Sequence, residues 1–339
     1  MSGGWPMRKR CVVMIAMALV LAVAAHSQHA PVHGAEPAWL DDARAEFPKT
    51  DFDQHAIDLS RVRAGGPARD GIPAIDAPKT VPVKQLRQLR GREPVIGVVL
   101  NGAARAYPLS ILIWHEIVND TLGGVPIAVT YCPLCNTGLV FDRRIAGDVL
   151  DFGVTGRLFA SNLLMYDRQT ESWWQQFTGE AVIGAHVGQT LALLPARLES
   201  YDDFRERAPE GEVLVPASPR ARSYGRNPYI GYDGSGAPFM YAGDLPADIA
   251  PLARVVRVDN QAWPLAAVRD AGERVHGDLR LQWHPGQASA LDAPVIADGL
   301  DVGSVVVQER TDEGWRDVPY SVDFAFAFHA FYPNGTLHR

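Results

Sequence analysis

The sequence of 339 residues predicts a mainly β protein, a β-rich α+β fold with a few short helices. Its 25 prolines and 31 glycines interrupt the chain so often that long helices are not expected. The segments between them are short and rich in Val, Ile and aromatic residues, a composition typical of strands. A phrase that recurs in the two halves of the chain suggests two related β modules.

The N-terminus has the pattern of a secretory signal peptide, which we assign to residues 1–25. Three basic residues at 8–10 precede the uncharged run 11–25. A membrane anchor is the alternative, but this run is shorter than the ~20 apolar residues that span a bilayer. We therefore expect a periplasmic or secreted protein that has no membrane span once the signal, including Cys11, is removed.

Composition excludes one class of partner and allows a large core. The formal net charge is −7, and removal of the basic signal makes the mature chain more acidic, so no nucleic-acid binding is expected. Hydrophobic residues make up 47% of the chain, enough for one large domain or two fused ones. The expected partner is an unidentified periplasmic or extracellular protein.

The mature chain divides into four predicted parts. Residues 26–80 are a polar, Pro-rich and irregular lead-in, and 81–217 form a first β module. Residues 218–249 are a connection rich in Gly, Pro and Tyr, and 250–339 form a second β module.

Turn and strand signals predict the elements of the first module in order. They are a short helix at 83–89, strands at 95–100 and 103–107 joined by Asn101-Gly102, a helix after Pro108 that carries Trp114, His115 and Glu116, and strands at 125–131 and 139–141.

The recurring phrase is Ala106-Tyr107-Pro108-Leu109, which returns as Ala262-Trp263-Pro264-Leu265. An apolar strand and a turn-forming Asn precede each copy, and a further strand follows each about twenty residues later. The later strands end at Cys132 and at His284, which makes these two residues equivalent in the repeat.

Cys132-Pro133-Leu134-Cys135 stands between two predicted strands and is the main functional candidate. The following Asn136-Thr137-Gly138 is a poor helix start, so a strand-turn-strand knuckle is expected in place of the helix that opens a thioredoxin-like redox site. Haem attachment needs His directly after the second Cys, and position 136 is Asn.

A knuckle of this kind favours a soft metal, copper or less strongly zinc, held by Cys132 and Cys135 with histidine. His115 is the first candidate for the additional ligand and His284 the second, and the less supported candidates are His329 and Met165. The function expected is metal carriage or electron transfer.

Two other functions remain open for the same cysteines. One is a periplasmic thiol-disulfide oxidoreductase in which Cys132 attacks and Cys135 resolves. The other is a non-catalytic binding protein in which Cys132 and Cys135 form a structural disulfide. No phosphate-gripping glycine loop is present, so no nucleotide is expected.

Several strings resemble an exported bacterial and archaeal family known as domain of unknown function 3179. They are Ala104 to Leu109, Trp114 to Asp120, Thr130 to Asn136, Phe152 to Gly156, Ser161 to Arg168, Tyr224 to Tyr229 and Phe324 to Pro333. The resemblance runs from about residue 80 to the C-terminus, and it implies functional weight for His115 and the two cysteines but no established activity. Family members tend to end in Phe-His-Pro where this chain has Phe331-Tyr332-Pro333 with His329 nearby, so the resemblance does not support a C-terminal histidine ligand.

Overall fold

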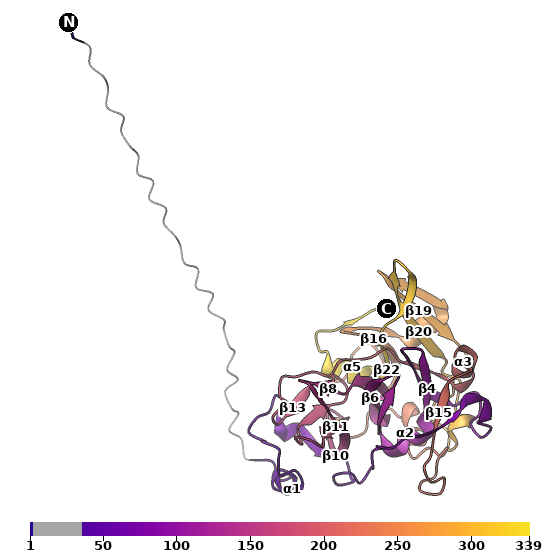
Figure 1. Cartoon of the computed structure of the whole chain (residues 1–339), viewed down its shortest axis with the longest axis horizontal. Helices are drawn as coiled ribbons and strands as arrows, with labels where there is room; N and C mark the ends of the chain where they lie inside the picture. Colours follow the sequence, from indigo (N-terminus) through magenta and orange to yellow (C-terminus); the bar gives the residue numbers. More distant parts are fainter. Residues whose placement is uncertain (3–35) are drawn as a thin grey trace. The chain divides into compact units, whose positions relative to one another are not determined.

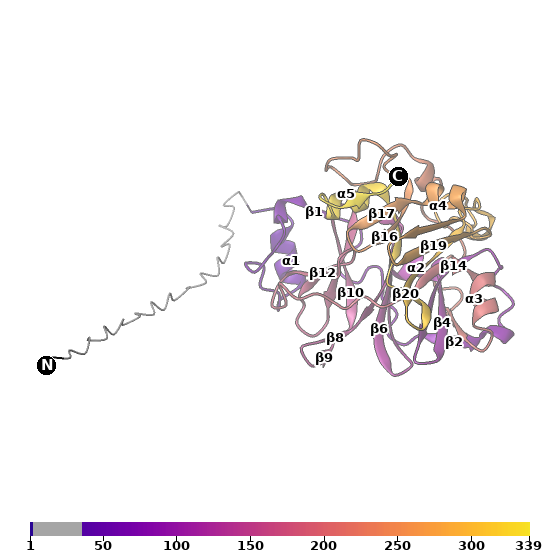
Figure 2. The same cartoon turned by 90° about the horizontal axis from the view of Figure 1, so that it is seen from above.

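The computed structural model describes residues 1–2 and 36–339, and it confirms the mainly β fold (Figures 1 and 2). Strands hold 39% of the residues and helices 16%, with the sheets arranged as a propeller-like ring of five blades. Almost all of the predicted signal peptide, 1–25, lies outside the described residues. Among the described residues, no helix combines the length and hydrophobicity needed to span a bilayer.

A hairpin and its helix form the centre of the first module. The strands β3 and β4 pair antiparallel, and Asn101 and Gly102 turn the chain between them at positive φ, as the sequence predicts. Because proline ends β4, helix α2 begins immediately after it. The sheet order is β14-β3-β4-β15-β2. The elements are β2 (Lys79–Pro82), β3 (Pro94–Leu100), β4 (Ala103–Pro108), α2 (Leu109–His115), β14 (Arg197–Ser200), α3 (Tyr201–Arg207) and β15 (Glu212–Val215).

The second module repeats this topology. Its elements are β16 (Arg254–Val258), β17 (Gln261–Pro264), α4 (Leu265–Ala271), β22 (Ser321–Phe324), α5 (Ala325–Phe331) and β23 (Thr336–Leu337). The outer strand β22 pairs antiparallel with β16, as β14 does with β3. The last strand β23 pairs parallel with β17, as β15 does with β4. The recurring phrase of the sequence therefore marks a recurring structural unit.

Each module inserts an antiparallel sheet after its central helix. The first contains β5 (Ile117–Leu122), β6 (Val125–Cys132) and β7 (Thr137–Asp142), and the second β18 (Glu273–His276), β19 (Leu279–His284), β20 (Ser304–Thr311) and β21 (Gly314–Asp317). Strand β6 ends at Cys132 and β19 at His284, so the two residues occupy matching places in the two sheets.

The first module carries a further sheet, which the lead-in covers. This sheet contains β1 (Val62–Ala64), β10 (Phe152–Phe159), β11 (Asn162–Asp167), β12 (Trp173–Gln175) and β13 (Ala181–Ile183), and a small hairpin, β8 (Arg144–Ile145) with β9 (Asp148–Val149), precedes β10 in the chain. The stretch 36–80, for which no regular element was predicted, contains α1 (Leu40–Glu46). Phe47 follows α1 and packs against Trp173, their ring centroids 5.0 Å apart, and α1 lies beside this sheet in Figures 1 and 2.

The predicted helix at 83–89 is only a single 3₁₀ turn, Val83–Gln85. Leu86 already has extended backbone angles, and together with Leu89 it packs against a small buried cluster. Packing of these two leucines outweighs the helical propensity of the polar residues between them. The other 3₁₀ turns are Leu59–Arg61, Pro133–Cys135, Tyr232–Gly234 and Ile296–Asp298.

One hydrophobic core joins the two modules. The largest buried cluster includes Ile96 and Tyr107 from the first module together with Val256 and Phe324 from the second. Arg197 on β14 also forms a two-pronged ion pair with Asp317 at the end of β21, at 2.6 and 2.7 Å. The modules are thus related in topology but are packed as one unit.

Candidate active site: a buried dithiol

The two cysteines lie on the knuckle that the sequence predicts. Strand β6 ends at Cys132, the 3₁₀ turn holds Cys135, and β7 returns with Thr137 paired to Cys132. Asn136 makes the reversal with φ at 53°, a left-handed conformation that Asn tolerates better than most residues. The side-chain amide of Asn136 donates to the Val322 carbonyl oxygen at 2.8 Å, so the second module holds the knuckle in place.

Both thiols are free, buried and directed at one carbonyl oxygen. Cys132 is 2% exposed and Cys135 0%. The Sγ atoms lie 3.9 Å and 3.5 Å from the carbonyl oxygen of Ser161. Ser161 and Ala160 form the two-residue turn between β10 and β11, both at positive φ, and this turn brings the carbonyl beneath the pair.

The environments of the two thiols differ. Burial alone would raise the pKa of Cys132, but hydrogen bonds from the Cys135 thiol and from the backbone N–H of Leu163 and of its own knuckle lower it. Burial and the hydrogen bond to Cys132 raise the pKa of Cys135 well above its usual value. Cys132 is therefore the sulfur that ionises first, and Cys135 keeps its proton.

Glu116 adds a buried carboxyl group beside Cys132. It follows α2 with φ at 59°, and its carbonyl oxygen accepts from Tyr131 N at 2.8 Å, which aligns it with the residue before Cys132. Glu116 is 8% exposed, and none of the described residues hydrogen-bonds its carboxyl group. Burial, and next the charge of Cys132, raise the pKa of Glu116 to about 8.

Tyrosines of the connection cover the dithiol. Tyr232 Oη donates to the Leu134 carbonyl oxygen at 2.9 Å and accepts from Phe239 N at 3.2 Å. Burial, followed by the charges of Glu116 and Cys132, raises the pKa of Tyr229. The connection 218–249 therefore forms part of the cysteine site.

The histidines named as possible ligands do not join the cysteines. His115 Nδ1 lies 2.7 Å from the Pro73 carbonyl oxygen, and its Nε2 lies 2.8 Å from Tyr224 Oη, so both ring nitrogens are already engaged. Burial also lowers the pKa of His115. His284 is exposed at the end of β19, in the sheet of the second module.

The remaining ligand candidates give no metal cluster. His329 is on α5, and Met165 is buried in the core on β11. In the part of the chain that the structure describes, no three or more His, Cys, Asp and Glu side chains come together in a way that could hold a metal ion. A Cys2His or Cys2His2 set for copper or zinc is therefore not assembled in this conformation.

Comparison with known proteins gives a family without an assigned activity. The family described as "Protein of unknown function (DUF3179)" matches residues 69–335. No curated protein and no solved structure matches the chain. The match covers most of the two modules, including both cysteines and Glu116.

Proposed function

The chain belongs to the DUF3179 family, and we propose that it is an exported thiol-disulfide exchange protein that works through Cys132, Cys135 and Glu116. The observation that carries the proposal is the buried, asymmetric dithiol. Two thiols share one carbonyl oxygen, the first is surrounded by hydrogen-bond donors, and an unpartnered carboxyl lies beside it. The signal pattern at 1–25 supports export to a compartment in which protein disulfides persist.

The proposed reaction transfers two electrons and two protons from the dithiol to a partner disulfide. The Glu116 carboxylate takes the proton of Cys132, and the Cys132 thiolate attacks one sulfur of the partner disulfide. A mixed disulfide forms, and the partner's other sulfur leaves and takes the proton from Glu116. Cys135 then attacks Cys132 Sγ, and its proton goes with the released partner sulfur. The products are a Cys132–Cys135 disulfide and a reduced partner, and the reverse sequence oxidises a partner dithiol.

A raised pKa suits Glu116 to both halves of the proton transfer. At neutral pH a carboxyl group with a pKa of about 8 exists in both forms, so it can accept a proton and give it back. An exposed carboxylate would hold its proton too weakly to return it to a leaving thiolate. Burial of the site is the main cause of this raised pKa, and the charge of Cys132 adds to it.

The test is redox equilibration of the full chain, in which intact mass is measured after mixing with glutathione buffers of stepped potential. We expect a Cys132–Cys135 disulfide to form reversibly, and Cys135→Ser to accumulate a mixed disulfide with glutathione at Cys132. Glu116→Gln should slow both directions while leaving the equilibrium potential nearly unchanged. A dithiol that stays reduced, or forms no mixed disulfide in Cys135→Ser, across all buffers would overturn the proposal.

The metal content of the same samples distinguishes thiol-disulfide exchange from the soft-metal function first expected from the sequence. Stoichiometric copper or zinc that persists in the wild type and is lost in Cys132→Ser would favour metal carriage over exchange. His115→Gln is the matched probe for a third ligand. Retention of metal in that variant would exclude His115 as a ligand.

A further inference from the structure

The connection 218–249 carries a large share of the exposed apolar side chains. Of the nine large hydrophobic residues that are exposed among the described residues, four lie on it, namely Ile230, Phe239, Met240 and Leu245. Exposed apolar side chains that gather on one segment, rather than scattering singly, are typical of sites of protein contact. Because the connection also covers the dithiol, a protein bound to it would lie at the cysteine site.

Phe239 has its backbone fixed at the dithiol while its side chain is largely exposed. Its carbonyl oxygen accepts from Ser161 Oγ at 2.5 Å, and its N–H donates to Tyr232 Oη at 3.2 Å. Ser161 supplies the carbonyl oxygen that both sulfurs face, and Tyr232 bonds the backbone of Leu134, between the two cysteines. Phe239 is nevertheless 58% exposed, so packing in the core does not explain a phenyl ring at this position.

The first part of the connection is basic in an otherwise acidic protein. Residues 218–232 contain three arginines and no acidic residue, whereas the whole chain has a net charge of −7. The arginines are Arg220, Arg222 and Arg226, all exposed, and none forms an ion pair with a described residue. Tyr224 in the same run bonds His115 Nε2 at 2.8 Å, so the run lies against the end of α2, next to Glu116.

We propose that the connection 218–249 is the docking surface for the polypeptide whose disulfide the dithiol exchanges, an inference that rests on the proposed function. The partner has an apolar side chain beside its cysteine, which packs on Phe239 and Met240. Acidic residues of the same partner meet the unpaired arginines, and this charge complementarity steers and orients the partner. A small polar disulfide such as oxidised glutathione lacks the apolar contact.

Docking on Phe239 also gives the partner access to Cys132. Cys132 is only 2% exposed, so a disulfide reaches it only when the connection moves. The two hydrogen bonds of the Phe239 backbone hold the connection closed over the pair. A partner that packs more tightly on Phe239 when these bonds are broken favours the open position by that difference in affinity.

The test is the rate at which disulfide-linked peptide dimers oxidise the reduced full chain, measured by intact mass after acid quenching. One peptide has Phe beside its cysteine and a run of Asp further along. The second has Ser in place of Phe, and the third has Lys in place of Asp. We expect the first peptide to react about tenfold faster than the second. It should also react severalfold faster than the third, by a margin that shrinks as salt is added.

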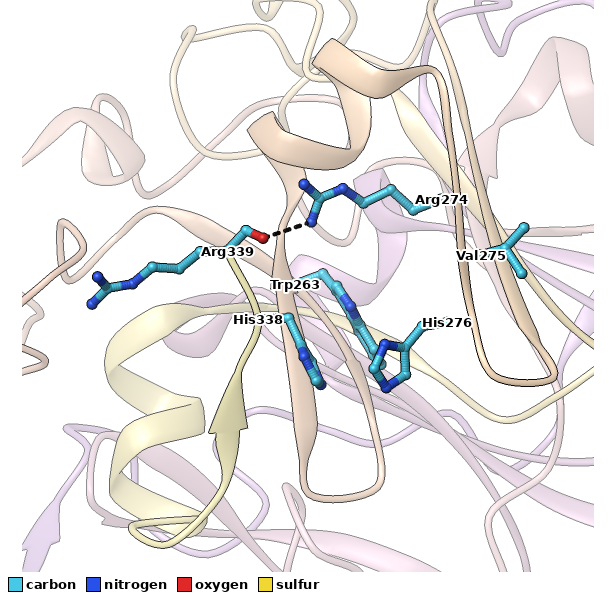
Figure 3. A pocket seen from close by; sticks show the side chains of 6 residues that line it. All are labelled: Trp263, Arg274, Val275, His276, His338 and Arg339. Atoms are coloured by element: carbon cyan, nitrogen blue, oxygen red, sulfur yellow. Dashed lines mark hydrogen bonds between the residues drawn. The ribbon is translucent and has the colours of Figure 1, made fainter.

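Two variants and two matched controls assign these preferences to the connection. Phe239→Ser should remove most of the advantage of Phe over Ser in the peptide, and Arg222→Gln should reduce the preference for Asp over Lys about twofold. Val275→Ser is the apolar control, because Val275 is 56% exposed on β18, where it lines a separate pocket (Figure 3). Arg87→Gln is the charge control, because Arg87 is exposed and forms no ion pair with a described residue. Both controls should react as the wild type does.

The outcomes separate docking from exchange itself. If the three peptides oxidise the wild type at equal rates while glutathione still exchanges, docking is wrong and the proposed function stands. If neither glutathione nor any peptide oxidises the dithiol, both are wrong. Docking is also overturned if folded Phe239→Ser, judged by its melting temperature, reacts as Val275→Ser does. Dimerisation of the wild type in light scattering that Phe239→Ser abolishes would assign the surface to a second copy of the chain instead.

Discussion

Glu116 should make the stability of the protein depend on pH. Its pKa is about 8 in the folded protein and near 4.3 in an unfolded chain, so the folded state holds the proton more tightly. The stabilisation is complete below the unfolded value and is lost as pH rises through the folded one. We predict that Glu116→Gln, which cannot ionise, gains roughly 2 to 4 kcal/mol of unfolding free energy relative to wild type between pH 5 and pH 8.

Urea unfolding in the presence of reductant at both pH values measures this difference. Glu206→Gln is a matched control because Glu206 is an exposed glutamate on α3. Its effect should be the same at pH 5 and pH 8. A difference between Glu116→Gln and wild type that does not change with pH would show that the carboxyl is not buried in solution.

The sequence predicted the local part of the site and missed its long-range part. Asn136 and the β-branched flanks indicate the knuckle because turn and strand preferences are local. Glu116 follows His115 in the sequence but was not selected as a site residue. Its place in the site depends on strand register, which sets it opposite the residue before Cys132. His115, in contrast, was selected from the sequence but does not join the cysteines. Its ring nitrogens are engaged by Pro73 and Tyr224, two residues far from it in sequence.

At the scale of elements, a buried ion pair ties β16 to β22 and reaches the knuckle. Arg257 Nε lies 2.7 Å from Asp323 Oδ2, and Thr137 Oγ1 donates to the other oxygen at 2.8 Å. Asp323 is fully buried, so loss of the arginine leaves an uncompensated charge. We predict that Arg257→Met costs about 3 to 5 kcal/mol of unfolding free energy, and that adding Asp323→Asn recovers a large part of it.

Denaturant unfolding of the two single variants and the double variant measures the coupling between Arg257 and Asp323. Arg316→Met is the control, because its ion pair with Glu309 lies on the exposed hairpin of β20 and β21. That substitution should change stability by less than ~1 kcal/mol. Equal costs for the buried and the exposed arginine would contradict the prediction.

The connection 218–249, the segment whose tyrosines cover the dithiol, should control access to the cysteines. Tyr232 Oη both donates to the knuckle and accepts from Phe239 N, so one hydroxyl fastens the segment at two points. We predict that Tyr232→Phe raises the rate of iodoacetamide alkylation of Cys132 severalfold without changing the melting temperature by more than a few degrees.

Tyr241→Phe is the matched control, because Tyr241 Oη donates to the Asp244 carbonyl oxygen within the same segment. It should leave the alkylation rate near that of wild type. Equal rates in wild type and Tyr232→Phe would mean that Cys132 is reached by another route.

Element prediction from the sequence was most reliable where it used the repeated phrase. Each hairpin ends in proline and passes directly into a helix, and both copies do this with the same signals. The outer strands β14 and β22 were not predicted, because each pairs with a strand far away in the chain. Their partners are fixed by packing, and short apolar segments carry no local signal for such pairing.

At the scale of the molecule, two repeats with one core should unfold together. The largest buried cluster takes side chains from both modules, and Arg197 joins β14 to Asp317 across them. The Asn136 side chain bonds the Val322 backbone, so the cysteine site itself needs both modules. We predict that the slowest-exchanging amides of β3 and β16 report the same opening free energy, and that Arg197→Gln lowers both equally. Native-state hydrogen exchange measures these values, and a lower value confined to β16 would mean that the second module opens independently. Since the knuckle depends on Val322, such independent opening would also expose Cys132, and the alkylation rate would then follow the opening of the second module.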